Sequence, residues 1–395
     1  MKNLFKYFLF IFISYSCDSK KSYHVSDRNE SDLLIFKKEV RLKIDSLTSN
    51  SSRSIKYVDV GGKEYLYQLN KVNNSIEIFN LREGEWVSRL TLDTDGPDGV
   101  GNVSYMLPIS SDSILVLSDL QRLYLVDSLG KVLNKYGPFY DRNTQIGYYL
   151  LAVSEVSPVY ADGKVYFATT NGYDVYQPPS ITNSLSSQEN ILELDLETKE
   201  YRALSGYPSH LEEATGLYPD HYYTVRYIEH VKNFNDSSFF VLSYPSSETI
   251  IVTDFRTYER EVYAGSSALG NVKPLYNAKD LRKLSSEEEA KDLATTHSYQ
   301  NIRYDRFRGL FYRVVELPYT DLEYMRSKDA TMGIKKWGMI ILDTEFNVIG
   351  EVIMNSELLA GAFLIVKEGI LIYNFEKNTS SEDSLVYDLY QINFK

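Results

Sequence analysis

The amino-acid sequence predicts an all-β fold, and three observations lead to this prediction. Short runs of alternating or continuous apolar residues, rich in β-branched and aromatic types, recur along the chain, as in β-strands. Very tight turns containing glycine, aspartate or asparagine separate many of these runs. The runs also form groups of four, which recur at intervals of roughly 40–70 residues and indicate one domain built from repeats.

The segment 113–137 shows the repeated unit most clearly. Its predicted strands are 113–119, 122–128 and 131–137, and Asp127-Ser-Leu-Gly130 forms the turn between the last two. In such a turn the aspartate can accept hydrogen bonds from nearby backbone N–H groups, and glycine tolerates a positive φ. An apolar residue followed by aspartate or asparagine marks the same turn in five units, at Asn80, Asp127, Asp195, Asp254 and Asp343, and Asp388 lies in the matching strand of a sixth.

The ends of the chain predict how the repeats close into a ring. The predicted units are 54–92, 102–137, 149–206, 225–265, 298–354 and the part from Gly361 onward. The first strand of the third unit is predicted over 150–161. The last unit lacks a fourth strand, whereas the predicted strand 33–44 precedes the first unit and has no partner nearby in sequence. Closed propellers remove the exposed sheet edge by pairing one terminus into the blade of the other. We therefore expect a six-bladed β-propeller of four-stranded antiparallel blades, closed by residues 33–44 in the last blade; two β-sandwiches or a β-solenoid are the alternatives.

The first residues predict a targeting signal. Lys2 and Lys6 precede the apolar run 7–13, which is too short to span a bilayer, and Cys17 is the only cysteine. This resembles a bacterial lipoprotein signal, in which the peptide is cut before the cysteine and the cysteine is acylated. Ser14 and Tyr15 depart from the strict pattern, and an ordinary secretory signal is the alternative. We expect a signal peptide at 1–16, lipidation of Cys17, a flexible tether at 17–32 and the propeller domain at 33–395.

Composition narrows the classes of partner. The chain carries 54 acidic and 42 basic residues, a net charge of −12, and has no basic stripe. Such a chain disfavours nucleic acid as a partner. Attachment to a membrane is therefore expected through the lipid on Cys17 and not through an amphipathic helix.

Loop lengths predict which end of the propeller binds a ligand. The long connections are 138–148, 171–188, 207–224, 266–297 and 318–336, and by strand parity they share one face. They are rich in tyrosine, whose ring and hydroxyl suit sugar stacking or a protein interface. The candidate binding residues are Tyr173, Tyr176, His221, Tyr222, Tyr223, His297, Tyr299, Arg303 and Arg313. For the tyrosines the alternative is a role in pinning the loops. For Arg303 and Arg313 we favour structural pairs in the fifth blade.

The 266–297 connection also predicts a short helix. Ser285 and Ser286 precede Glu288 and Glu289 at the spacing of a capping box.

No set of catalytic residues, metal ligands or cofactor-binding motifs stands out. His210, His221 and His230 lack the spacing of a metal site. The segment 93–99 looks like a calcium loop, but Pro97 falls at a ligand position and a turn is the better interpretation. Carboxylate pairs for glycoside hydrolysis cannot be selected among so many acidic residues. The sequence therefore predicts no catalytic residue, no metal and no cofactor.

The chain resembles the six-bladed propeller lipoproteins of unknown function that are abundant in Bacteroidetes. The resemblance rests on the signal ending in Cys17, on Gly96-Pro-Asp-Gly-Val-Gly101, and on 297–305 leading to Phe311-Tyr-Arg313. It implies an envelope-anchored propeller and supplies no activity. We expect a non-enzymatic binding or scaffold protein for a glycan, a peptide or an envelope protein; the alternative is a propeller enzyme acting on carbohydrate or lactone substrates in the periplasm. Because no strongly acidic run follows Cys17, we expect an outer-membrane lipoprotein facing the periplasm, with surface display as the alternative.

Overall fold

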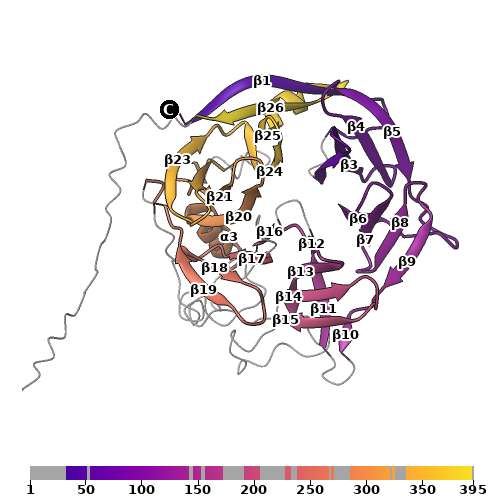
Figure 1. Ribbon diagram of the computed structural model, residues 1–395. Helices are drawn as coiled ribbons and strands as arrows, with labels where there is room; N and C mark the ends of the chain where they lie inside the picture. The colour runs from indigo at the N-terminus through magenta and orange to yellow at the C-terminus, as the bar shows by residue number, and fades with distance from the viewer. Residues whose placement is uncertain are drawn as a thin grey trace, which may run out of the picture.

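The protein is a closed ring of six β-sheets, as Figure 1 shows for the computed structural model. The structure describes residues 33–50, 54–141, 146–152, 156–171, 191–204, 227–232, 238–266, 268–270, 285–320, 323–324 and 335–393. Five sheets contain a path of four antiparallel strands in chain order, and the sixth combines the last three strands with the first. The predicted six-bladed β-propeller is therefore confirmed.

The first three blades follow one another from Ile55 to Leu204. Blade 1 contains β2 (Ile55–Val60), β3 (Lys63–Asn70), β4 (Ser75–Asn80) and β5 (Glu85–Thr91). Blade 2 contains β6 (Val103–Pro108), β7 (Ser113–Ser118), β8 (Leu123–Asp127) and β9 (Val132–Tyr136). Blade 3 contains β10 (Tyr140–Asp141), β11 (Ile146–Leu151), β12 (Val159–Ala161), β13 (Lys164–Asn171), β14 (Ile191–Asp195) and β15 (Tyr201–Leu204).

The remaining three blades close the ring. Blade 4 contains β16 (Tyr227–Lys232), β17 (Ser238–Ser243), β18 (Thr249–Thr253) and β19 (Glu259–Tyr263). Blade 5 contains β20 (Ser298–Asp305), β21 (Leu310–Glu316), β22 (Trp337–Leu342) and β23 (Val348–Met354). Blade 6 contains β24 (Leu358–Val366), β25 (Gly369–Asn374), β26 (Ser384–Ile392) and, as its outer strand, β1 (Leu34–Lys43). The connections that the structure describes include the short helices α3 (Ser286–Thr295) and α5 (Phe375–Thr379).

The N-terminal strand closes the last blade, as predicted. β1 pairs antiparallel with β26, from Leu34 opposite Ile392 to Lys43 opposite Ser384. Two glycines show that β1 takes the place of an ordinary outer strand. Gly84 lies in the outer turn of blade 1, and a Cβ on it would lie 2.5 Å from the carbonyl oxygen of Arg41 in β1. Gly130 lies in the outer turn of blade 2, and a Cβ on it would lie 2.9 Å from the carbonyl oxygen of Thr91 in β5. Each turn thus packs on the outer strand of the blade before it.

Side-chain packing between the blades forms the core. The buried apolar residues gather into six clusters, one between each pair of neighbouring blades of the described structure. The cluster between blades 6 and 1 contains Leu42 of β1 together with Leu66 and Phe79 of blade 1. Since each blade packs on two neighbours, the loss of one strand affects the contacts on both sides of the ring.

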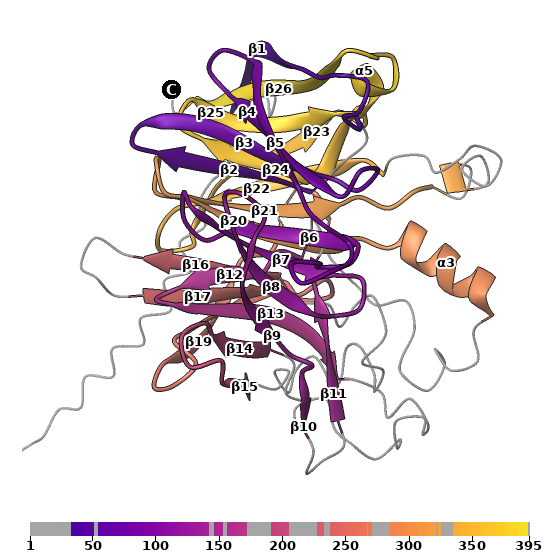
Figure 2. The ribbon, with the colours of Figure 1, turned by 90° about the vertical axis from the view of Figure 1, so that its right-hand side faces the viewer.

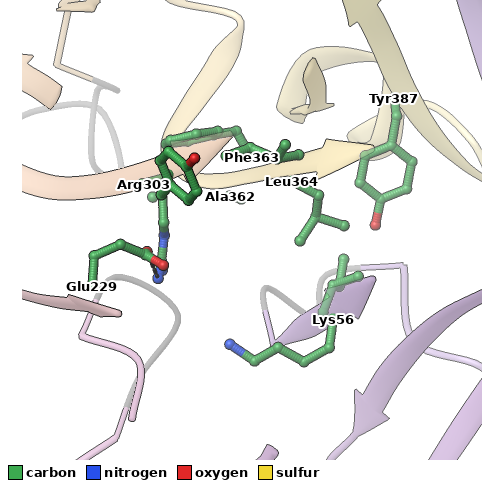
Figure 3. A pocket seen from close by; sticks show the side chains of 11 residues that line it. Lys56, Glu229, Arg303, Ala362, Phe363, Leu364 and Tyr387 are labelled. Atoms are coloured by element: carbon green, nitrogen blue, oxygen red, sulfur yellow. Dashed lines mark ion pairs between the residues drawn. The ribbon is translucent and has the colours of Figure 1, made fainter. Parts of the chain in front are cut away.

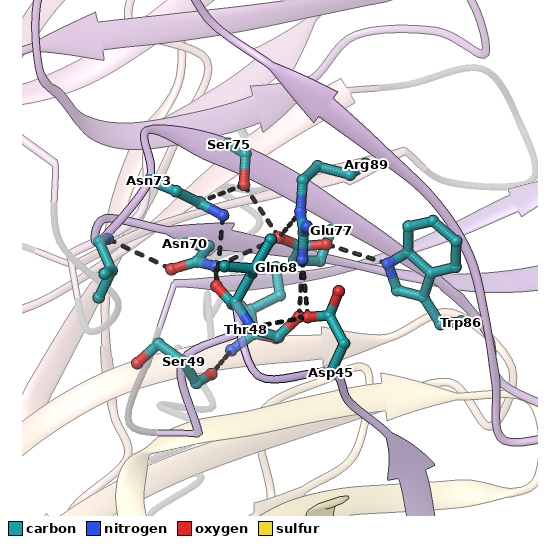
Figure 4. A network of polar contacts seen from close by, with 12 residues as sticks. Asp45, Thr48, Ser49, Gln68, Asn70, Asn73, Ser75, Glu77, Trp86 and Arg89 are labelled. Carbon is teal, nitrogen blue, oxygen red and sulfur yellow. Dashed lines mark hydrogen bonds and ion pairs between the residues drawn. The ribbon is translucent and has the colours of Figure 1, made fainter. Parts of the chain in front are cut away.

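A buried polar network holds the segment that leads from β1 into blade 1 (Figure 4). Glu77, which is fully buried, accepts hydrogen bonds from Ser75 Oγ at 2.9 Å, Trp86 Nε1 at 3.0 Å and Arg89 Nε at 2.6 Å. Arg89 also donates to Asp45 Oδ1 at 2.9 Å. The Thr48 hydroxyl and Arg89 lower the pKa of Asp45 to about 2. The network therefore ties the chain after β1 to strands β4 and β5.

The predicted outer turns are confirmed in five blades. In each turn the side-chain oxygen accepts a hydrogen bond from the backbone N–H two residues later, which fixes the turn without long loops. This holds for Asn80, Asp127, Asp195, Asp254 and Asp343. In the sixth blade Asp388 lies within β26 and instead accepts from Asn374 Nδ2 at 2.9 Å and Lys377 Nζ at 2.9 Å.

The predicted capped helix is also present. Ser285 is the N-cap of α3, its hydroxyl accepts from the backbone N–H of Glu288, and the Glu288 carboxylate accepts from the backbone N–H of Ser285. Figure 2 shows that α3 and α5 lie toward one end of the ring, whereas the tight turn between β2 and β3 lies at the other. Among the described residues, no helix is long and apolar enough to cross a membrane.

One predicted strand is wrong. The sequence predicts a continuous inner strand over 150–161, but the structure has β11 and β12, which pair with opposite ends of β13. Pro158 lies just before β12; it has no N–H group, and its ring restricts Ser157 to an extended conformation. The interruption places Ser157, which is 6% exposed, at the centre of the ring instead of in a regular ladder.

Candidate functional site

Charged side chains from several blades meet in a cavity at the axis of the ring (Figure 3). The cavity has a volume of about 220 Å³ and is lined by the inner strands β2, β16, β20 and β24, with Tyr387 of β26. Lys56, Glu229 and Arg303 form its charged side, and 361–365 form a mostly apolar wall. Because strands of the propeller supply these groups, the described walls of the cavity are held by the scaffold itself.

Ser157 joins the two cations of this cavity. Lys56 Nζ donates a hydrogen bond to Ser157 Oγ at 2.9 Å, and Arg303 Nη2 donates to the same oxygen at 3.0 Å. Blades 1, 3 and 5 thus meet at one hydroxyl group. Arg303 Nη1 also lies 3.7 Å from Glu229 Oε2, an ion-pair contact longer than a good hydrogen bond.

The environment of Lys56 disfavours its charged form. The ammonium group lies 4.8 Å from the centre of the Tyr105 ring, and no carboxylate of the described residues lies within 4 Å of it. Burial, reinforced by the positive charge of Arg303 and opposed by Glu229, lowers the pKa of Lys56 to about 7. Near neutral pH this lysine is therefore close to the point at which it gains or loses its proton.

Glu229 is shifted in the opposite direction. Its side chain is 18% exposed and lines the cavity. Burial raises the pKa of Glu229 to about 7, although Arg303, the His230 backbone and Lys56 all favour the charged carboxylate. Two groups that titrate near neutral pH and face one cavity are typical of a functional site.

These two shifts predict how stability depends on pH. Between pH 4.5 and 7 the folded protein keeps a proton on Glu229 that the unfolded chain releases, so the free energy of unfolding falls as pH rises. Between pH 7 and 10.5 the unfolded chain keeps a proton on Lys56 that the folded protein has lost, so the free energy of unfolding rises with pH. We expect the contribution of the pair to be smallest near pH 7, measured by urea unfolding at a series of pH values.

Two variants separate the contributions to this profile. Glu229→Gln should remove the falling part below pH 7, and Lys56→Met should remove the rising part above it. If both variants give profiles parallel to that of the wild type, the two pKa shifts are wrong.

Two of the predicted site residues, Tyr299 and Arg313, pack together inside the wall between blades 4 and 5. Both side chains are fully buried, and the guanidinium carbon of Arg313 lies 3.7 Å from the centre of the Tyr299 ring. Arg313 donates to Ser243 Oγ and to three carbonyl oxygens, those of Glu248 at 3.1 Å, Ala264 at 2.9 Å and Ser247 at 2.6 Å. Arg313 thus holds the blade 4 turn against blade 5, away from the cavity at the axis.

The other predicted residues lie apart from this pair. Arg303 faces the axial cavity, and His297 lies between α3 and β20, where burial lowers its pKa. A Cβ on Gly270 would lie 2.6 Å from His297 Nε2, so the ring packs closely on the backbone there. Tyr173, Tyr176, His221, Tyr222, Tyr223 and Cys17 lie outside the described residues.

Lys56, Glu229 and Ser157 were not predicted from the sequence to belong to a site. A usable signal was present, since a charged residue in the first strand of a predicted blade points to the axis or into the packing between blades. Lys56, Glu229 and Arg303 are such residues in blades 1, 4 and 5. The contribution of Ser157 depends on the interruption between β11 and β12, which strand patterns alone do not reveal. Within the described residues no group of three or more His, Cys, Asp or Glu side chains could hold a metal ion.

Comparison with known proteins places this fold in a family. A family model described as "Domain of unknown function (DUF4221)" matches residues 30–353. The chain belongs to this family. The crystal structure of a DUF4221 family member from Bacteroides vulgatus is similar to the chain with a TM-score of 0.74 and 22% sequence identity, over 92% of this chain and 99% of that one. The predicted resemblance to a six-bladed propeller family of unknown function is therefore confirmed.

More distant structures share only a general likeness. A calcium-binding regucalcin from Agrobacterium tumefaciens has a TM-score of 0.44 and 10% identity, over 91% of this chain and 96% of that one. BamB from Moraxella catarrhalis has a TM-score of 0.35 and 10% identity, over 85% and 71% of the two chains. Likenesses at this level carry no functional argument. A comparison with curated proteins found no match.

Proposed function

We propose that this DUF4221 protein is an envelope-anchored binding or scaffold propeller that presents the end with the long connections to a glycan, a peptide or an envelope protein. The observation that carries this proposal is the difference between the two ends of the ring. One end is closed by turns fixed by aspartate or asparagine side chains, whereas the connections that contain α3 and α5 lie at the other (Figure 2). Elaborated connections on a rigid scaffold commonly carry binding function.

The anchor in this proposal is a lipid on Cys17, in the outer membrane and facing the periplasm. It is supported by the sequence before Cys17, which resembles a lipoprotein signal. Metabolic labelling with a fatty acid that carries an alkyne should mark the wild-type protein and leave a Cys17→Ser variant unmarked. Unlabelled wild-type protein in the membrane fraction would contradict the anchor.

The binding role predicts a ligand-dependent rise in melting temperature. A ligand that binds only the folded state raises the melting temperature once its concentration exceeds its dissociation constant. We expect the chain from Ser19 onward to respond to a member of a panel of glycans, peptidoglycan fragments and envelope peptides, or to retain a specific protein in pull-downs from the native envelope. A failure of both measurements would contradict this proposal.

A propeller enzyme acting on carbohydrate or lactone substrates is the second candidate. The observation that favours it is the pair Lys56 and Glu229, whose pKa values lie near 7 in the axial cavity, as a general base and acid require. Turnover of a panel compound, detected by NMR and abolished by Glu229→Gln, would establish this candidate in place of the first.

A further inference from the structure

Among the described residues, one buried amine lines the axial cavity without forming an ion pair. Lys56 Nζ donates a hydrogen bond to the neutral Ser157 Oγ at 2.9 Å and lies 4.8 Å from the centre of the Tyr105 ring. The charged groups that act on it from the described strands around it are Glu229 of β16 and Arg303 of β20. Because Lys56 lacks a salt bridge within this part of the structure, burial favours its neutral form.

The neutral form makes Lys56 a nucleophile. Burial lowers the pKa of Lys56 to about 7, so about half of the molecules carry an uncharged amine at pH 7. A lysine with the reference pKa of about 10.4 is uncharged in only roughly one molecule in 2,500 at that pH. An uncharged lysine amine in a pocket adds to carbonyl compounds and forms an imine. The Lys56 side chain is half-buried, so a small molecule in the cavity can reach it.

The other walls of the cavity suit a neutral carbonyl compound. The buried Tyr387 hydroxyl points toward the space between Leu364 and Lys56 (Figure 3), and it has no hydrogen-bond partner within the described structure. Burial raises the pKa of Tyr387, so the hydroxyl keeps its proton and can donate to a carbonyl oxygen. Ala362 and Phe363 belong to the apolar wall of the same cavity. A molecule with one hydrogen-bond acceptor and a short apolar body fits both features.

We propose that Lys56 condenses with a small aliphatic aldehyde in the axial cavity. The lone pair of Nζ forms a bond to the carbonyl carbon as the C=O π bond opens, and a proton passes from nitrogen to oxygen to give a carbinolamine. The carbinolamine hydroxyl then leaves as water with a proton from Glu229, whose pKa burial raises to about 7, and a protonated imine remains. A volume of about 220 Å³ lies below the usual range of roughly 300–1,000 Å³ for drug-sized ligands, so the aldehyde is small.

Two hollows meet at Lys56 and give the aldehyde a path from the end with the tight turns. The second hollow, of about 450 Å³, is lined by Lys56 together with Gly61 of the β2–β3 turn and Ser110 of the β6–β7 turn. The proposed function rests instead on the end with the long connections. The chemistry of Lys56 goes beyond that function, and either can fail without the other.

The direct test traps the imine in the full chain, kept in a mild detergent at pH 7. Propanal is added with sodium cyanoborohydride, which reduces an imine to a stable propylamine, and peptide mapping by mass spectrometry measures the rate of labelling at each lysine. We expect Lys56 to be labelled at least tenfold faster than two control lysines of the same chain. Lys71 is exposed, and Lys335 is buried outside the cavity, where burial also lowers its pKa but Nζ lies 3.6 Å from Glu316 Oε2.

Two further measurements also use the wild type, so no variant has to fold. Because the cavity is small, replacement of propanal by 2-naphthaldehyde should slow the labelling of Lys56 at least tenfold relative to that of Lys71. In urea, where the ring is unfolded, Lys56, Lys71 and Lys335 should be labelled at similar rates. The proposal would be overturned if Lys56 in the folded protein reacts no faster than Lys71, if it shows no preference for propanal, or if its faster labelling persists in urea.

Discussion

Removal of residues 33–44 should destabilise the whole propeller and cause it to aggregate. These residues contain β1, the outer strand of blade 6, which pairs with β26 along its length. Leu34 and Leu42 are buried, and at about 2 kcal/mol for each leucine their burial contributes about 4 kcal/mol. Loss of β1 also leaves β26 as an open edge, which templates pairing with other chains.

The measurement compares a chain that begins at Ser19 with the same chain lacking residues 33–44. We expect the shorter chain to melt at a clearly lower temperature and to form large species in size-exclusion chromatography. Addition of a synthetic peptide with the sequence of 33–44 should restore part of the lost stability. An unchanged melting temperature would contradict closure of the ring by β1.

A glycine pair tests the same interface without removing any strand. Gly84 and Gly61 both have a positive φ, of 69° and 58°, so alanine is strained at either position. A Cβ at Gly84 would collide with the Arg41 carbonyl of β1, whereas a Cβ at Gly61 would meet nothing within 4 Å. Gly84→Ala should therefore lower the melting temperature more than Gly61→Ala. Equal effects would mean that the outer turn of blade 1 does not press on β1.

Replacement of Arg313 by methionine should lower the free energy of unfolding by several kcal/mol, because a buried polar group left without its hydrogen-bond partner costs about 1–3 kcal/mol. The guanidinium group is fully buried and satisfies three carbonyl oxygens and the Ser243 hydroxyl, all in blade 4. Burial lowers the pKa of Arg313 to about 10, so the group is still charged at neutral pH. Methionine removes all four of these hydrogen bonds, although the Glu248 carbonyl still accepts from the backbone N–H of Ala264 at 2.9 Å.

Urea unfolding of Arg313→Met and Arg313→Lys would test this prediction. Lysine keeps the charge but has three donors without the planar fork of arginine, so it should recover only part of the lost stability. Arg256→Met is the control, because the Arg256 side chain is exposed in the outer turn of blade 4 and should change stability little. A loss in Arg313→Met no larger than that in Arg256→Met would show that this network contributes nothing to stability.

Local patterns were enough to predict the architecture. Strands β7, β8 and β9 lie within a residue of their predicted bounds 113–119, 122–128 and 131–137, because alternating apolar residues and turn residues act over a few positions. The unpaired strand 33–44 and the missing fourth strand of the last unit predicted the closure, since each leaves an unsatisfied sheet edge. The capping box of α3 was visible for the same local reason.

The axial site was not predicted as a unit. Arg303 was named as a candidate, but its neighbours Lys56, Ser157 and Glu229 come from parts of the chain up to about 250 residues away. Arg313 was named beside Arg303, and nothing in the sequence distinguishes a guanidinium that faces a cavity from one that holds two blades together. We favoured a structural role in the fifth blade for both arginines. Arg313 has such a role, whereas Arg303 also lines a cavity.

The sequence by itself determined the repeat, the number of blades, the strand that closes the ring and the tight turns at one end of the ring. Each of these depends on residues adjacent in the chain or on the simple requirement that sheet edges be paired. Only the tertiary structure decided that three blades deliver Lys56, Ser157 and Arg303 to one point, with Glu229 beside them. The physical reason is that the pKa values and charges of these groups depend on burial and on neighbours from other blades, which exist only after the ring has closed.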